Sequence, residues 1–143
     1  MCALVAGEAP DPRIAENDHA VAVLERFASR RGHVVVVLRR HEERVERLSR
    51  ETWLGLHALA HDVARAIDVE LAPLRIFVCA LGSAVKRVNS FPHVHLHVIP
   101  LYDGGDGDRP AEVLTWTQGV LVYEDGEGEA LAASLARAIA HAR

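Results

Sequence analysis

Residues 91–100 (FPHVHLHVIP) constrain the fold of this chain most, because histidines and apolar residues alternate in them one by one. Strict alternation is typical of a β-strand, whose successive side chains point to opposite faces of a sheet. We therefore expect one face to pack on a core and the other to carry a row of imidazoles about 6.5 Å apart. The two faces consist of Val94, Leu96 and Val98, and of His93, His95 and His97. Pro100 cannot donate a ladder hydrogen bond and is expected to end the strand.

A row of imidazoles on a strand fits three kinds of surface. The first is a solvated sheet face that is rich in histidine. The second is a metal site, since a His-x-His pair can supply two ligands to one zinc ion. The third is a catalytic site in which a neutral imidazole attacks a phosphorus atom while its neighbours position it and move protons. The alternation by itself does not choose between the three.

The chain has 143 residues, of which 50% are hydrophobic and 25% charged, and its formal net charge is −4. This length and composition predict one soluble domain, residues 1–143. The negative charge argues against a broad electrostatic grip on nucleic acid or on an anionic membrane. Two cysteines, Cys2 and Cys79, are too few for a disulfide framework. Because no signal peptide or membrane-length apolar run is recognisable, we expect a cytoplasmic protein.

Changes in hydrophobic period divide the chain into strands and helices. Strands are expected at residues 19–27, 32–40, 75–81, 93–99 and 119–125, the main amphipathic helix after the N-cap Ser49, and a C-terminal helix at residues 126–143. The continuous apolar run 34–38 places its strand in the middle of the sheet. Residues 101–110, rich in glycine and aspartate, are expected to form a mobile loop. Strands on both sides of one main helix indicate an α+β fold.

Further polar residues have a route to the imidazole row. Asn89 and Ser90 immediately precede the alternating stretch, and a short polar loop can offer amide, hydroxyl and backbone donors to an anion. Ordinary turn chemistry explains these two residues equally well. His33 opens the valine-rich strand and is either a fourth member of the row or a surface residue at a strand end.

The chain resembles the histidine triad (HIT) proteins of the Hint and Fhit kind. Their motif is His-φ-His-φ-His-φ-φ, with φ apolar, and residues 93–99 read HVHLHVI. The resemblance extends over nearly the whole chain, through VAGEAP, GHVVVVLRRH, LSRETW, ALGS and PLY. It implies an antiparallel sheet with one main helix and a C-terminal helix, usually paired into a homodimer. It also implies binding of a purine nucleotide or nucleotide conjugate and attack on its α-phosphorus.

The resemblance assigns catalytic roles to the histidines. His95 would be the nucleophile that becomes transiently nucleotidylated. His97 and His33 would support it and help the leaving group to depart, and His93 would orient the row from the other side. The transferase branches of the family carry glutamine at the third triad position, so a histidine there favours water as the final acceptor.

The resemblance also implies nucleotide contacts. Asn89 and Ser90 occupy the phosphate-contacting positions, and Glu25 matches a position whose side chain holds the ribose hydroxyls. The expected activity is therefore hydrolysis of nucleoside phosphoramidates or small nucleotide conjugates, with dinucleoside polyphosphates as the less favoured substrate class and no required cofactor. Two alternatives stay open: a nucleotide-binding regulatory module without turnover, and a HIT-fold pathway enzyme that uses the histidine cleft for other acid-base chemistry. The intact triad argues against the first, because a binder needs no nucleophile.

A zinc site is the last implication. Many family members bind structural zinc through a Cys-x-x-Cys pair, the histidine after the valine-rich strand and the first triad histidine. Cys2, His41 and His93 match three of these positions, and the other cysteine position falls before Met1. Structural zinc usually takes four ligands, so we expect weak, partial occupancy and no catalytic role for the metal.

Overall fold

The computed structural model describes residues 1–81 and 91–142. Its centre is a five-stranded antiparallel sheet with the strand order β1-β2-β3-β5-β4. The strands are β1 (Arg13–Glu16), β2 (Ala20–Leu24), β3 (Val34–Leu38), β4 (Arg75–Cys79) and β5 (His95–Leu101). The helices are α1 (Cys2–Ala6), α2 (Arg50–Leu71), α3 (Pro110–Leu114) and α4 (Glu127–Ala142), with short 3₁₀ turns η1 (Val45–Arg47) and η2 (Asp106–Asp108). The predicted α+β fold with a main and a C-terminal helix is confirmed.

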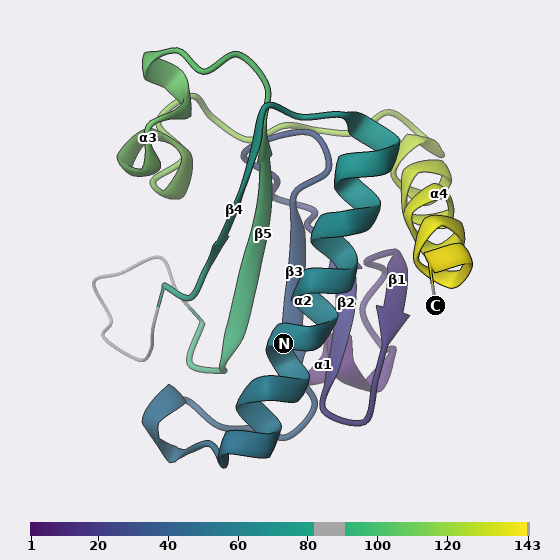
Figure 1. The fold of residues 1–143 in the computed structure, drawn as a ribbon, viewed down its shortest axis with the longest axis vertical. Helices are drawn as coiled ribbons and strands as arrows, with labels where there is room; N and C mark the ends of the chain where they lie inside the picture. The colour runs from purple at the N-terminus through teal and green to yellow at the C-terminus, as the bar shows by residue number, and fades with distance from the viewer. Residues whose placement is uncertain (82–90, 143) are drawn as a thin grey trace.

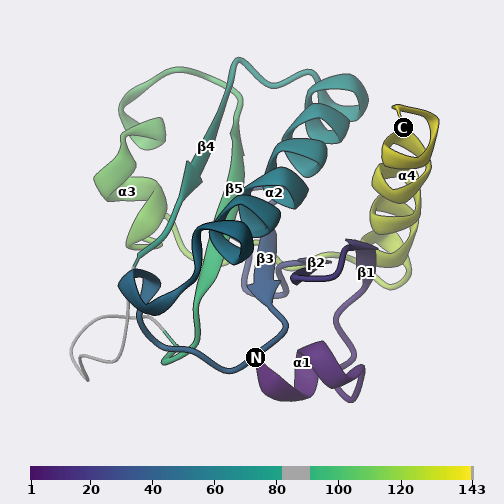
Figure 2. The ribbon, with the colours of Figure 1, turned by 60° about the horizontal axis from the view of Figure 1, so that its bottom comes forward.

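The helices form layers on the two faces of the sheet. Helices α2 and α4 lie against each other and cover one face (Figure 1), where the main apolar core forms. Helix α1 lies on the opposite face (Figure 2), where Met1, Leu4 and Val5 pack on valines of β2 and β3. None of the helices in the described ranges is long and apolar enough to span a membrane.

Helix α2 begins and ends as its sequence predicts. The Ser49 hydroxyl accepts a hydrogen bond from the Thr52 N–H at 3.1 Å, which caps the first turn. The helix ends at Leu71, where Ala72 turns into the left-handed conformation and Pro73 follows. Its buried side is a stripe at intervals of three and four, formed by Leu56, Leu59, Ala60, Val63, Ala66 and Ile67. This stripe closes the core over the sheet.

The two strands that carry the candidate site are central. All five residues of β3 are buried between β2 and β5, as the valine run predicts. The alternation around β5 holds too, since Val94, Leu96 and Val98 belong to the main core. The opposite face, however, is also buried: His93, His95 and His97 are only 3%, 4% and 5% exposed. The interpretation of a solvated histidine face is therefore wrong.

Other expectations are corrected by the structure. Strand β5 continues through Pro100 to Leu101, because β3 pairs with β5 only as far as Val98, and Pro100 faces the single neighbour β4. Residues 119–125 do not form the expected strand and contribute one isolated bridge, from Leu121 to Ala28. The short elements α1, β1 and α3 were not expected, since four or five residues carry too little periodic signal.

Candidate active site

The central feature of the site is a chain of hydrogen bonds through three buried imidazoles. His33 Nε2 lies 2.9 Å from His97 Nδ1, and His97 Nε2 lies 3.2 Å from His95 Nε2. A backbone group closes each end. The Ser29 N–H donates to His33 Nδ1 at 3.2 Å, and His95 Nδ1 lies 2.7 Å from the carbonyl oxygen of His93. We name the three imidazoles of His33, His97 and His95 the histidine relay.

The two backbone ends determine where every proton of the relay lies. An N–H group only donates and a carbonyl oxygen only accepts, so His33 Nδ1 is unprotonated and His95 Nδ1 carries a hydrogen. Neutral His33 then donates from Nε2 to His97, and neutral His97 donates from Nε2 to His95. The hydrogen-bond network therefore assigns an unprotonated Nε2 to His95. This nitrogen, with its lone pair, is the candidate nucleophile.

Burial keeps the relay uncharged, as this assignment requires. Burial lowers the pKa of His97 to about 3, and the neighbouring His95 adds to the shift. Burial likewise lowers the pKa of His33 well below its usual value. The pKa of His95 is also lowered by burial, against the opposing effect of its hydrogen bond to the backbone carbonyl. All three imidazoles are therefore neutral at pH 7.

The turn that leads into β3 is clamped by residues from the C-terminal half of the chain. The Tyr102 hydroxyl donates to the carbonyl of residue 31 at 2.7 Å, and the N–H of residue 32 donates to the Tyr123 hydroxyl at 2.9 Å. Beside them, Arg30 Nε lies 3.2 Å from Asp108 Oδ1 in an ion pair that is mostly buried. These contacts hold the first imidazole of the relay in place.

Glu25 lies beside the relay, directly after β2. Its N–H donates to the carbonyl of His33 at 2.9 Å, and its carboxylate accepts a hydrogen bond from the Phe27 N–H at 2.9 Å. Burial raises the pKa of Glu25, and the hydrogen bond from Phe27 partly offsets that shift. The carboxylate lines a groove of about 370 Å³ together with Leu24 and Tyr123. It can therefore accept hydrogen bonds from a ligand in this groove.

Trp116 is a neighbour of the relay that the sequence did not reveal. Its ring centroid is 6.0 Å from that of His33 and 6.1 Å from that of His97. Its indole N–H donates to the carbonyl of Phe27 at 2.6 Å. Trp116 lies between two segments that were expected to be a loop and a strand, and no spacing links it to the histidines. An aromatic residue in the polar run TWTQG is its one visible signal.

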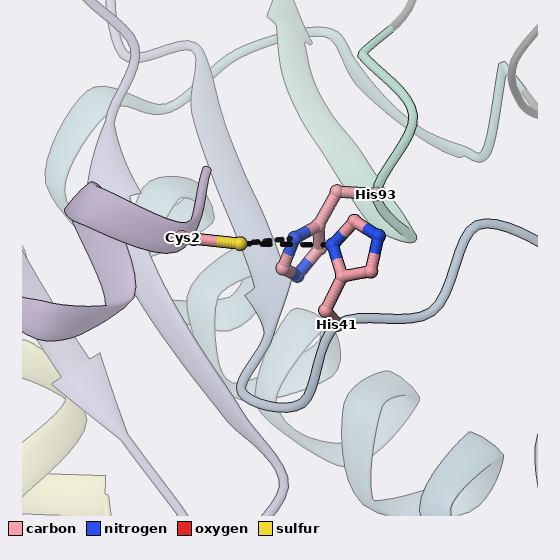
Figure 3. A group of neighbouring side chains, drawn as sticks. All are labelled: Cys2, His41 and His93. Atoms are coloured by element: carbon pink, nitrogen blue, oxygen red, sulfur yellow. Dashed lines mark hydrogen bonds between the residues drawn. The ribbon is translucent and has the colours of Figure 1, made fainter.

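A second cluster joins α1 to the sheet, and Figure 3 shows its three side chains pointing toward one another. Cys2 Sγ lies 3.6 Å from His41 Nδ1 and 3.6 Å from His93 Nδ1. Cys2 comes from α1, His41 from the segment after β3, and His93 from the segment before β5. The three ligand atoms lie within 4.8 Å of one another, so this cluster could hold a metal ion.

Two further contacts orient the imidazoles of this cluster. His93 Nε2 donates to the carbonyl of Leu38 at 2.7 Å, which leaves Nδ1 unprotonated and directed at Cys2. His41 Nε2 lies 3.7 Å from a carboxylate oxygen of Glu43. Outer contacts of this kind orient histidine ligands in metal sites. One thiolate and two imidazoles fit zinc, and among the described residues the cluster has these three members.

The structure thus separates the expected site residues into two groups. The ring of His93 belongs to the cluster with Cys2 and His41, and only its backbone carbonyl reaches the relay. His33, expected from the resemblance, is fully buried in the relay. Asn89 and Ser90, the expected phosphate contacts, lie outside the described residues.

Comparisons with known proteins show which sequences and structures this chain is similar to. A family model described as HIT domain matches residues 6–104. An uncharacterized HIT-like protein of Mycobacterium tuberculosis is 31% identical over 98% of this chain and 92% of its own length. Adenosine 5′-monophosphoramidase hnt1 of Schizosaccharomyces pombe is 28% identical over 70% of this chain and 71% of its own. The crystal structure of a Zn-bound histidine triad family protein from Mycobacterium smegmatis has a TM-score of 0.75 at 25% identity, covering 99% of this chain and 92% of that chain.

Proposed function

The chain belongs to the histidine triad (HIT) family, and we propose that it is a nucleotide hydrolase acting on nucleoside phosphoramidates and related purine nucleotide conjugates. In this proposal His95 attacks the α-phosphorus and forms a covalent nucleotidyl intermediate. The observation that carries the proposal is the order of hydrogen bonds in the relay, from which the assignment of a lone pair to His95 Nε2 follows. Similarity to a fungal adenosine 5′-monophosphoramidase supports the substrate class.

The first half-reaction forms one bond and breaks another. His95 Nε2 bonds to phosphorus as the bond from phosphorus to the leaving group breaks. His97 Nε2–H donates to that same lone pair, so during the attack it turns its hydrogen bond to a phosphoryl oxygen and stabilises the charge there. The carbonyl of His93 stabilises the positive charge that develops on His95 through the Nδ1–H hydrogen bond.

The second half-reaction releases the nucleotide. A water molecule attacks phosphorus and the bond to His95 breaks, which restores the neutral imidazole. The leaving group takes up one proton from the solvent in the first half-reaction, and the attacking water returns one to the solvent in the second, so protons balance over the cycle. We assign water as the acceptor because the third triad residue is His97, where the transferase branches carry glutamine.

The nucleoside side of the substrate is assigned to the groove at Glu25. Its carboxylate would accept hydrogen bonds from the ribose hydroxyls, and Leu24 would flank the base. Leu24 is the last residue of β2 and pairs with Val34, and Glu25 follows it and donates to the carbonyl of His33. Asn89 and Ser90 remain the proposed phosphate contacts.

Zinc is proposed at the cluster of Cys2, His41 and His93. When bound, the metal would supply a cross-link between α1 and the sheet. Because the cluster has three protein ligands within the described ranges, we expect weak and partial occupancy. The proposed nucleophile is an imidazole outside this cluster, so the metal has no part in the reaction.

The proposed assembly is a homodimer formed along β4. This strand is an edge of the sheet, with β5 as its neighbour within the described residues. Val78 on this edge and Leu74 beside it are 45% and 70% exposed. An unpaired edge with apolar side chains is a template for pairing with a second copy. The mass of the protein in solution, measured by light scattering, tests this assembly.

The decisive experiment replaces the nucleophile. His95→Ala should reduce turnover of an adenosine phosphoramidate by several orders of magnitude while adenosine monophosphate still binds. The wild-type protein, quenched during turnover, should carry the mass of one adenylyl group on the peptide that contains His95. His61→Ala, on the exposed side of α2, is the matched control and should leave turnover unchanged. Substantial activity in His95→Ala would refute covalent catalysis, and binding without any wild-type turnover would favour the regulatory module.

A further inference from the structure

Trp116 is held in an unusual conformation by the two residues beside it. The Thr115 hydroxyl donates to the carbonyl of Ala111, and the Thr117 hydroxyl donates to the carboxylate of Glu112 and lies 3.2 Å from the carbonyl oxygen of the same residue. Both acceptors belong to α3, so the backbone is anchored on each side of the indole. Between the anchors, Trp116 has φ +53°, a left-handed conformation that bulky residues rarely adopt. The anchored turn therefore directs the indole to one place.

That place is the end of the histidine relay that His33 forms. The indole ring contacts both His33 and His97 at centroid distances within the usual range for aromatic pairs. The indole N–H donates to the carbonyl of Phe27, and this hydrogen bond holds the ring in one orientation. Trp116 thus joins α3, the turn before His33 and the triad strand at a single point.

An indole in contact with His33 and His97 would reduce the access of water to these two imidazoles. Among the residues that the structure describes, the titratable groups beside His97 are His33 and His95 in the relay and Cys79, its partner in the β4–β5 ladder. Burial raises the pKa of the Cys79 thiol, so it is neutral at pH 7, as the imidazoles are. With these neighbours uncharged, the exclusion of water decides whether His97 takes up a second proton.

We propose that Trp116 is a positioning residue that shields His33 and His97 from water and holds them in line with His95. This inference rests on the proposed function, because it serves a reaction at His95. Trp116 is not assigned a contact with the substrate. Its task is to preserve the direction in which the relay donates its hydrogen bonds.

The kinetic test compares two substitutions of Trp116 with one of the other tryptophan. Trp116→Ala should lower kcat for an adenosine phosphoramidate roughly 10- to 100-fold while KM stays unchanged, because misplacement of a catalytic group has effects of this size. The acid limb of its pH–rate profile should move toward neutral pH, because water then reaches His97 and its pKa is less strongly lowered. Trp116→Phe keeps a ring and should restore most of kcat and the acid limb. Trp53→Phe is the control and should change neither, since the Trp53 ring lies on α2 with its centroid 4.0 Å from that of His57.

Two kinetic outcomes would overturn the inference. One is a folded Trp116→Ala protein, verified by circular dichroism, with the kcat and pH profile of the wild type. The other is a loss that resides in KM alone, which would make Trp116 a substrate contact. A residue with a purely structural role would lower stability and leave the acid limb in place.

A measurement without substrate separates this inference from the proposed function. Nitrogen-15 spectra of the histidine side chains report the Nε2–H protons of His33 and His97 and their exchange with water. In the wild type these protons should exchange slowly, and in Trp116→Ala clearly faster. Equal exchange in the two proteins would sink the inference. A wild-type protein that turns over no nucleotide would defeat the proposed function, while the exchange rates would still decide the role of Trp116.

Discussion

Replacement of His97 by glutamine should make the protein less sensitive to acid. The pKa of His97 is lowered from its usual 6.5 to about 3 in the folded protein, chiefly by burial. Between these two pKa values, residue 97 therefore binds a proton in the unfolded chain but not in the folded chain. This group therefore contributes stability above pH 6.5, and the contribution is lost as the pH falls from 6.5 toward 3.

The size of the effect follows from these two pKa values. Each pH unit within this window removes about 1.4 kcal/mol of unfolding free energy for one such group. Between pH 7 and pH 5, protonation of residue 97 in the unfolded chain removes about 2 kcal/mol. The His97 side chain is 5% exposed, so solvent screening reduces this figure little. Glutamine can donate and accept in place of the imidazole, but it does not titrate.

The assay is urea unfolding at pH 7, 6 and 5, followed by circular dichroism at one protein concentration. A chelator is present, because acid would also release any metal from the neighbouring cluster. The loss of stability between pH 7 and pH 5 should be about 2 kcal/mol smaller in His97→Gln than in the wild type. His61→Gln, on the exposed side of α2, should follow the wild type. An equal loss in His97→Gln and wild type would mean that His97 takes up a proton as readily in the folded as in the unfolded chain, and the lowered pKa of His97 would be refuted.

Two further predictions concern ligands. Glu25→Ala should weaken the binding of adenosine monophosphate, measured by calorimetry, by about 1.5 to 3 kcal/mol, and the binding of its 2′,3′-dideoxy analogue much less. Equal weakening of the binding of both ligands would place the ribose elsewhere. Protein purified without a metal-affinity tag should contain less than one zinc per chain, and mild chelation should remove it without loss of turnover. Cys2→Ser should abolish the zinc content measured by elemental analysis and Cys79→Ser should not, so zinc that survives in Cys2→Ser would place the metal outside the cluster.

The sequence predicted those parts of the fold whose residues repeat over a sufficient length. The continuous apolar run of β3, the alternation of β5 and the periodic helix α2 with its N-cap are visible in the sequence, as is the alanine-rich helix α4, and the structure has these elements where expected. Short elements depend instead on partners that are distant in sequence. Helix α1 exists against four valines of β2 and β3, and residues 119–125 lack the pairing that would make them a strand. Pro100 stays within β5 because of where β3 ends, which the local sequence does not contain.

The same division applies to the candidate site, and it explains why side-chain identity alone leaves the chemistry open. Alternation placed His95 and His97 on one face, and the family resemblance added His33. The reactivity of His95, however, depends on a backbone N–H at residue 29 and a backbone carbonyl at residue 93, which are groups that nearly every residue carries. Their fixed polarity sets the direction of three neutral imidazoles between them. A motif can therefore identify the histidines of such a site, whereas the lone pair that makes one of them a nucleophile is set by the path of the chain around it.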